Sequence, residues 1–208
     1  AAVLVVAAGV NSAALKLFEK LDLGYKPPQT TKTYISEIYL GGEELAKHLG
    51  NSMHVFLLNL PNLEFAALIP KGDYVTLCLL GREVGDSLVQ SLLNAPELRK
   101  CLPSNWQLPE RYCHCSPRIN VKGAIQPFDD RLVFVGDSGI ARLYKDGIGS
   151  AYHTAKAAAM TALFHGVSAK DFRRHYWPVC RAICRDNNIG KLIFAITGQQ
   201  QKRRCDRI

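Results

Sequence analysis

The feature that most constrains the fold is an apolar segment that ends in a glycine and an acid and precedes a glycine pair. Residues 131–137 read RLVFVGD, and after nine intervening residues 147–149 read GIG. A short β-branched run bounded by glycine favours a strand, and the alanine-rich run 148–164 favours a helix. The sequence therefore predicts a strand, a turn with an acid, and a helix that begins at glycines.

Such a unit brings together groups suited to a ligand. A carboxylate at the end of a strand accepts hydrogen bonds from ligand hydroxyls. Glycines let the backbone approach a flat ligand, and the helix start offers free N–H groups and a positive dipole end. A plain strand–loop–helix connection remains the alternative. The candidate binding residues are Gly136, Asp137, Gly147, Ile148 and Gly149.

A second group of segments predicts a largely antiparallel sheet with helices on one face. Four runs are rich in β-branched or aromatic residues, and the links PNL and KGD are turn-like. Residues 42–50 and 85–101 predict helices beside them. The four predicted strands are TTKTYISEIYL (30–40), MHVFLLN (53–59), EFAALIP (64–70) and YVTLCLL (74–80). The overall fold class is therefore α+β.

The C-terminal third predicts helices. Ser168 and Asp171 have the spacing of a capping box, which predicts a helix start. Pro178 is expected to kink or break that helix after Trp177. Residues 191–198, KLIFAITG, fit either a helix or a strand.

Composition excludes several classes of protein. The 208 residues are 48% hydrophobic and 21% charged, which suits a folded domain with a sizeable core rather than a disordered chain. No apolar run is long enough for a transmembrane helix, and the N-terminal AAVLVVAAG lacks the basic region of a signal peptide. The net charge of +8 is scattered without interleaved aromatics, so we expect no nucleic-acid partner.

The cysteines indicate a reducing compartment. Their odd number, seven, argues against a disulfide framework. Cys113 and Cys115 flank a histidine, and Cys180 and Cys184 share a helical spacing, so four thiolates could form a metal site. Neither spacing is C-x-x-C, and we therefore expect reduced cysteines and no bound metal.

The segment VFVGDSGIARLYKDGIG (133–149) resembles the second FAD-binding motif of flavoproteins with the p-hydroxybenzoate hydroxylase fold. These flavoproteins include the geranylgeranyl reductase family. The resemblance implies that Asp137 binds a ribityl hydroxyl of FAD and that residues 147–149 face the pyrimidine edge of the flavin. The positive helix end would then stabilise negative charge at flavin N1 on reduction.

Two further segments match the same family in the same order. Residues 4–16, LVVAAGVNSAALK, resemble a strand that ends in Ala-Asp-Gly before a helix. Residues 64–81, EFAALIPKGDYVTLCLLG, resemble the sheet of the substrate-binding part. No strand–GxGxxG–helix segment for the ADP half of FAD occurs in the chain, so the resemblance implies that this segment lies upstream of Ala1.

The chain departs from the family pattern at four positions. Ala8 stands where the family usually has Asp, and Tyr144 stands where it usually has Pro. Ala151 replaces the usual Asn of the hydroxylases, and Ala67 replaces an aromatic residue of the geranylgeranyl reductases. These departures leave the substrate and the reaction open, and no catalytic residue is assigned.

The resemblance divides the chain into four expected parts. Residues 1–24 would be a remnant of the FAD-binding domain, 25–125 the substrate-binding sheet, 126–166 the second FAD motif with its helix, and 167–208 a helical segment. Tyr34, Tyr39, Phe56 and Phe65 are candidate cavity residues, with a place in the core as the alternative favoured by their type.

The expected function is that of an FAD-dependent oxidoreductase, closest to geranylgeranyl reductase-like enzymes, acting on an apolar, isoprenoid-type substrate. NADPH is a candidate electron donor and a redox protein a candidate partner. A cytoplasmic location is expected, with attachment to a membrane surface as an option but no integral span. The chain alone is expected to be inactive and to bind FAD weakly. The alternatives are a flavin-dependent aromatic hydroxylase and a non-catalytic ligand-binding or interaction domain with a decayed flavin motif.

Overall fold

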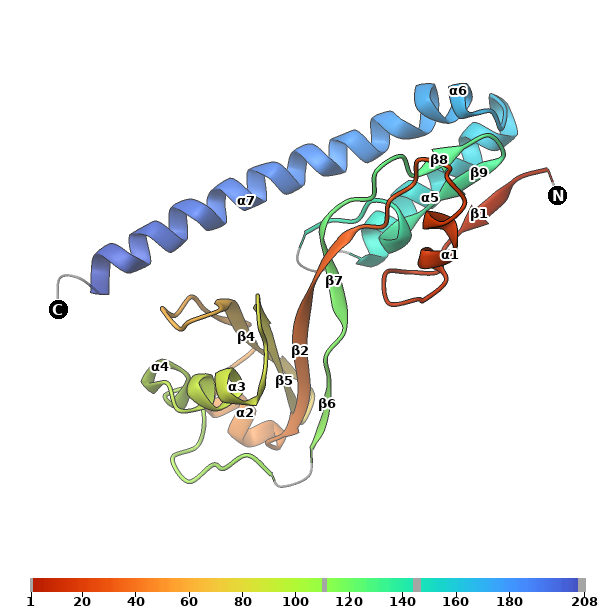
Figure 1. Cartoon of the computed structure of the whole chain (residues 1–208). Helices are drawn as coiled ribbons and strands as arrows, with labels where there is room; N and C mark the ends of the chain where they lie inside the picture. The colour runs from red at the N-terminus through yellow and green to blue at the C-terminus, as the bar shows by residue number, and fades with distance from the viewer. Residues whose placement is uncertain (1, 110–111, 144–146, 206–208) are drawn as a thin grey trace. The chain divides into compact units, whose positions relative to one another are not determined.

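The structure is a computed structural model that describes residues 2–109, 112–143 and 147–205. The chain forms two compact units: residues 1–30 and 118–196 make up the first, and residues 31–117 with 197–208 the second. Helices and strands occur in both, so the α+β class expected from the sequence is confirmed (Figure 1). The four expected parts of the chain remain a prediction.

The second unit is built on an antiparallel sheet with the order β3-β4-β5-β2-β6. Its strands are β2 (Gln29–Tyr39), β3 (His54–Phe56), β4 (Leu63–Lys71), β5 (Tyr74–Gly81) and β6 (Cys113–Cys115), of which β2 begins in the first unit. A tight turn at Gly72, whose φ of +61° suits glycine, joins β4 to β5. All four strands predicted for this sheet therefore lie in it.

Helices pack against one face of this sheet through a shared apolar core (Figure 1). Ile38, Leu68 and Leu77 of the sheet pack in the same cluster as Leu45 of α2 and Leu92 of α3. Tyr34 and Phe56 belong to this core as well, whereas Tyr39 is exposed. The helices are α2 (Gly42–His48), α3 (Asp86–Leu93) and α4 (Pro96–Arg99).

The single helix predicted over residues 85–101 is wrong in one respect. The structure has two helices, α3 and α4, with Asn94 and Ala95 between them. Pro96 explains the interruption, because proline lacks the N–H of a helix interior and its ring clashes with the carbonyl one turn earlier. At the first position of α4 the same residue is favourable.

The first unit has a three-stranded sheet with the order β1-β9-β8. β1 (Leu4–Val6) runs parallel to β9 (Leu132–Phe134), and β8 (Phe128–Asp129) runs antiparallel to it. Side chains of β9 alternate between two cores: Val133 packs with Phe172 and Tyr176, and Phe134 packs on the opposite face. The central strand is therefore covered on both faces. Helix α1 (Leu15–Glu19) and strand β7 (Arg118–Lys122) also belong to this unit.

The chain after the Asp137 turn is mainly helical. α5 (Gly147–Phe164) leads to α6 (Ala169–Asp171), a π-helical segment (Phe172–Tyr176) and α7 (Trp177–Cys205). The capping box of Ser168 and Asp171 is present as predicted, and residues 191–198 lie in α7. No helix of the described residues is long and apolar enough to cross a membrane.

Of the kink or break expected at Pro178, the structure shows no break. The chain stays helical through it, and the π-helical segment immediately precedes α7, in which Pro178 is the second residue. A proline is tolerated near the start of a helix, and the wider π turn before it changes the local hydrogen-bond pattern. The distortion is therefore taken up in residues 172–176 rather than by a break.

Candidate functional site

The candidate site begins at the turn that follows β9. Gly136, Asp137 and Ser138 form one turn of 3-10 helix. Gly136 has a φ of +61°, and a Cβ placed on it would lie 3.1 Å from Cβ of Ala151. Its N–H donates to Oγ1 of Thr154 over 2.9 Å. A glycine is therefore required here by both backbone conformation and the close approach of α5.

Buried hydrogen bonds fix the conformation of this turn. Oγ of Ser138 lies 2.8 Å from the carbonyl oxygen of Val6 and 2.7 Å from that of Val135, and its single hydrogen is donated to one of them at a time. The hydroxyl of Tyr25 donates to the carbonyl oxygen of Ser138 over 2.7 Å. Ser138 is fully buried. The position of Asp137 is therefore fixed by its neighbours in the turn.

The carboxylate of Asp137 meets the start of α5. A Cβ placed on Gly147 would lie 3.8 and 3.9 Å from the two carboxylate oxygens. Among the described residues, none donates a hydrogen bond to this carboxylate, and burial raises the pKa of Asp137 above its usual value. The group is thus partly desolvated and receives no hydrogen bond from the part of the chain that the structure describes, which makes it a candidate ligand-binding carboxylate.

The other predicted site residues lie in the first turn of α5. Ile148 is 90% exposed, whereas Gly149 is partly buried. The structure brings Gly147 together with Asp137 and places the start of an 18-residue helix beside them. Tyr144, one of the departures from the family pattern, lies outside the described residues.

Asn120 on β7 is a site residue that sequence reasoning missed. Its side chain is 5% exposed, and Nδ2 donates to the carbonyl oxygen of Asp137 over 3.0 Å. Its Oδ1 has no hydrogen-bond partner within the described part of the chain. An Asn between apolar strand residues is unfavourable without a partner, and this was the one available sequence signal.

A separate cavity of about 860 Å³ lies in the second unit. Its lining includes Tyr39, Trp106 and the basic residues Lys47, Arg99 and Lys100. The Arg99 guanidinium donates to the carbonyl oxygen of Trp106, and Lys47 lies 3.8 Å from a carboxylate oxygen of Glu44. The cavity is therefore lined by both polar and apolar residues, and two of its basic side chains, Lys47 and Arg99, already interact with neighbouring residues.

The cysteines form no ligand cluster in the described residues. Cys113 and Cys115 are exposed on β6, whereas Cys180 lies in the core and burial raises its pKa to about 12. The six described cysteines are free thiols. Over the described ranges, no three His, Cys, Asp or Glu side chains gather as metal ligands.

Comparison with known proteins gives matches by structure alone. No protein-family model and no curated protein matches the sequence. A geranylgeranyl bacteriochlorophyll reductase-like protein from Thermoplasma acidophilum matches with a TM-score of 0.64 and 13% identity, over 97% of this chain and 50% of that chain. A flavin-dependent halogenase from Xanthomonas campestris matches with a TM-score of 0.57 and 12% identity, over 93% and 36%.

A third match is p-nitrophenol 4-monooxygenase from Pseudomonas putida, with a TM-score of 0.50 and 16% identity, over 86% of this chain and 46% of that chain. The chain has a fold found in flavin-dependent oxidoreductases, halogenases and monooxygenases. It spans half or less of the length of these three proteins.

Proposed function

We propose that this chain is the flavin-facing part of an FAD-dependent oxidoreductase. The observation that carries the proposal is the carboxylate of Asp137, which is partly desolvated, has no donor among the described residues and lies beside the start of α5. A ribityl hydroxyl of FAD would supply the missing donor. Because a hydrogen bond to the charged form favours it, FAD would lower the raised pKa of Asp137.

Two other features fit the same cofactor. Oδ1 of Asn120 is a buried acceptor that a ligand O–H or N–H could satisfy, and it lies on the residue that holds the backbone of Asp137. Gly147 and Gly149 carry no side chain at the positive end of α5, where a flat ring would approach the backbone. FAD, when bound, would supply the redox chemistry, while these residues orient it.

For the substrate we propose an apolar, isoprenoid-type molecule. The likeness to a geranylgeranyl bacteriochlorophyll reductase-like protein supports this choice over others. An aromatic hydroxylase is the second candidate, supported by the likeness to p-nitrophenol 4-monooxygenase. NADPH consumption that yields hydrogen peroxide or a hydroxylated product would favour the second candidate, and reduction of a polyprenyl double bond would favour the first.

We further propose that the binding site for the ADP half of FAD lies in a part of the protein outside this chain. β1 is an edge of its sheet in the described residues, and Leu4 and Val5 on it are about half exposed, at 51% and 50%. Unpaired apolar strand edges are normally covered. Further parallel strands on this edge would complete a dinucleotide-binding sheet.

The first test is the flavin content of the full-length protein. Absorbance of the purified protein, followed by identification of the flavin released on denaturation, should give FAD close to one per chain. A colourless full-length protein that cannot be loaded with FAD would contradict the proposal and favour the ligand-binding or interaction domain.

A further inference from the structure

The segment that follows the Asp137 turn, residues 139–143, bonds to both α5 and α7. Gly147, at the start of α5, lies close to the carboxylate of Asp137. This part of the loop is firmly packed, because Ile140 and Ala141 are almost completely buried. What holds this part of the loop therefore helps to set the geometry of the candidate flavin site.

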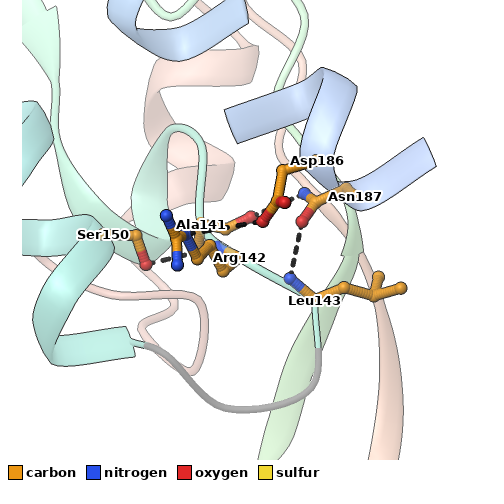
Figure 2. A network of polar contacts seen from close by, with 6 residues as sticks. All are labelled: Ala141, Arg142, Leu143, Ser150, Asp186 and Asn187. Carbon is orange, nitrogen blue, oxygen red and sulfur yellow. Dashed lines mark hydrogen bonds and ion pairs between the residues drawn. The ribbon is translucent and has the colours of Figure 1, made fainter. Parts of the chain in front are cut away.

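Asn187 on α7 holds the loop from both sides of Arg142 (Figure 2). Its Oδ1 accepts a hydrogen bond from the N–H of Leu143 over 2.8 Å, and its Nδ2 donates to the carbonyl oxygen of Ala141 over 2.9 Å. A carboxamide has one acceptor and one donor end, so a single side chain satisfies both backbone groups. This pair of hydrogen bonds is the Asn187 bracket.

Two further contacts tie the same segment. The N–H of Arg142 donates to Oγ of Ser150, a fully buried residue in the first turns of α5, over 3.2 Å. Gly190 lies one turn after Asn187, and a Cβ there would be 4.0 Å from Cδ2 of Leu143. The segment is thus fastened to α5 on one side and to α7 on the other.

The ion pair beside the bracket contributes less. Nε of Arg142 lies 3.6 Å from Oδ2 of Asp186, and the two side chains are 46% and 61% exposed. Exposed pairs of this kind are worth little, since water and salt screen them. Asn187 rather than Asp186 is therefore the residue of α7 that fixes the loop.

We infer that Asn187 is a positioning residue for flavin binding: it sets the spacing between Asp137 and the start of α5 without touching the cofactor. This inference rests on the proposed function. It makes the C-terminal helix a part of the cofactor site, although Asn187 lies 50 residues after Asp137 in the sequence.

The test compares Asn187→Ala with Asn188→Ala in the full-length protein. Asn188 is the exposed neighbour on the same helix and is the matched control. FAD titration of the apoprotein should show affinity weakened about three- to tenfold by Asn187→Ala and unchanged by Asn188→Ala, the range expected for a lost neutral hydrogen bond. Asn187→Leu, which keeps the branched shape of the side chain without its hydrogen-bonding groups and favours the helix, should weaken it similarly.

Hydrogen exchange of the ligand-free protein supplies a readout that does not depend on FAD. Asn187→Ala should speed exchange at the Leu143 amide, while thermal unfolding shows whether the whole fold is weakened. If FAD binds wild type and Asn187→Ala equally well, the inference is wrong and the proposed function stands. If wild type binds no FAD, the proposed function fails and the inference with it. An unchanged exchange rate at Leu143 would also overturn the inference.

Discussion

Two aspartates of the first unit have opposite environments. Asp171 lies at the start of a helical segment, and its carboxylate accepts hydrogen bonds from the backbone N–H and the hydroxyl of Ser168, over 3.1 and 2.6 Å. These bonds lower its pKa. Asp137 lies at the end of a strand with no such donors in the described residues, and burial raises its pKa.

The carboxylate of Asp171 stabilises the fold, whereas we propose that the carboxylate of Asp137 serves to bind a ligand. Ionised Asp171 is stabilised by groups that the fold itself provides. Ionised Asp137 is held in a partly desolvated position, and this costs the ligand-free protein stability. A carboxylate that lowers the stability of the ligand-free protein and lies in a rigid turn is a candidate for ligand binding.

The largest effect should come from the glycine pair beside Asp137. Gly149→Val would place a branched side chain at the start of α5, where we propose that the flavin ring lies. FAD affinity of the full-length protein should fall by at least one to two powers of ten, on the order of the 1.5–3 kcal/mol of a charge-assisted hydrogen bond. Fluorescence quenching of FAD measures it, and Leu163→Val, at the exposed far end of the same helix, is the control. An unchanged affinity would show that the start of α5 is not part of the FAD site.

The capping box should respond in stability and not in ligand binding. Ser168→Ala removes the side chain that caps the segment and that donates to Asp171. We expect the free energy of unfolding to fall by about 1 kcal/mol, the usual cost of losing an N-cap. Chemical denaturation measures this loss. FAD affinity should stay at the wild-type value. A large loss of affinity would contradict the assignment of Asp171 to stability and of Asp137 to FAD binding.

We expect Asn120, like Asp137, to contribute to FAD binding. Asn120→Ala removes the buried acceptor and the donor to the carbonyl oxygen of Asp137. FAD affinity should weaken about three- to tenfold, as for one neutral hydrogen bond. Isothermal titration of the full-length apoprotein gives the value. If Asn120→Ala lowers only the free energy of unfolding, Asn120 is a structural residue of the turn.

The smallest effect is a difference in pH dependence between the two acids. Because the folded pKa of Asp137 lies above its usual 3.8, its contribution to stability is present below pH 3.8 and is lost as pH rises through the folded pKa. The folded pKa of Asp171 lies below 3.8, so its contribution is present above 3.8 and is lost as pH falls. Thermal unfolding of ligand-free Asp137→Asn and Asp171→Asn against pH should show these opposite trends, with Asp137→Asn more stable than wild type near neutral pH. A destabilised Asp137→Asn protein would contradict the account.

The sequence predicts the parts of the molecule that local patterns encode. The capping box follows from the spacing of Ser168 and Asp171, and the β4–β5 hairpin follows from KGD between two apolar runs. Pro96 carries a local signal as well, and its position explains the interruption between α3 and α4.

The remaining site contacts could not be predicted because they join segments that are distant in the sequence. Asn120 and Asp137 are on β7 and after β9, and the Asn187 bracket joins α7 to the loop before α5. No spacing rule links such residues, since only tertiary packing brings them together. Sequence patterns therefore indicate the candidate carboxylate and glycines, which stay a prediction, whereas the contacts that position them required the structure.

The most direct test is an FAD titration of the full-length apoprotein with Asp137→Ala and Asp171→Ala as a matched pair. Asp137→Ala should weaken FAD binding by about one to two powers of ten, since one charge-assisted hydrogen bond is lost. Asp171→Ala should leave the affinity unchanged at a temperature well below its unfolding transition. If Asp137→Ala held FAD as tightly as wild type, the turn at Gly136 and Asp137 would be only a connection between a strand and a helix, and the proposed site would be wrong.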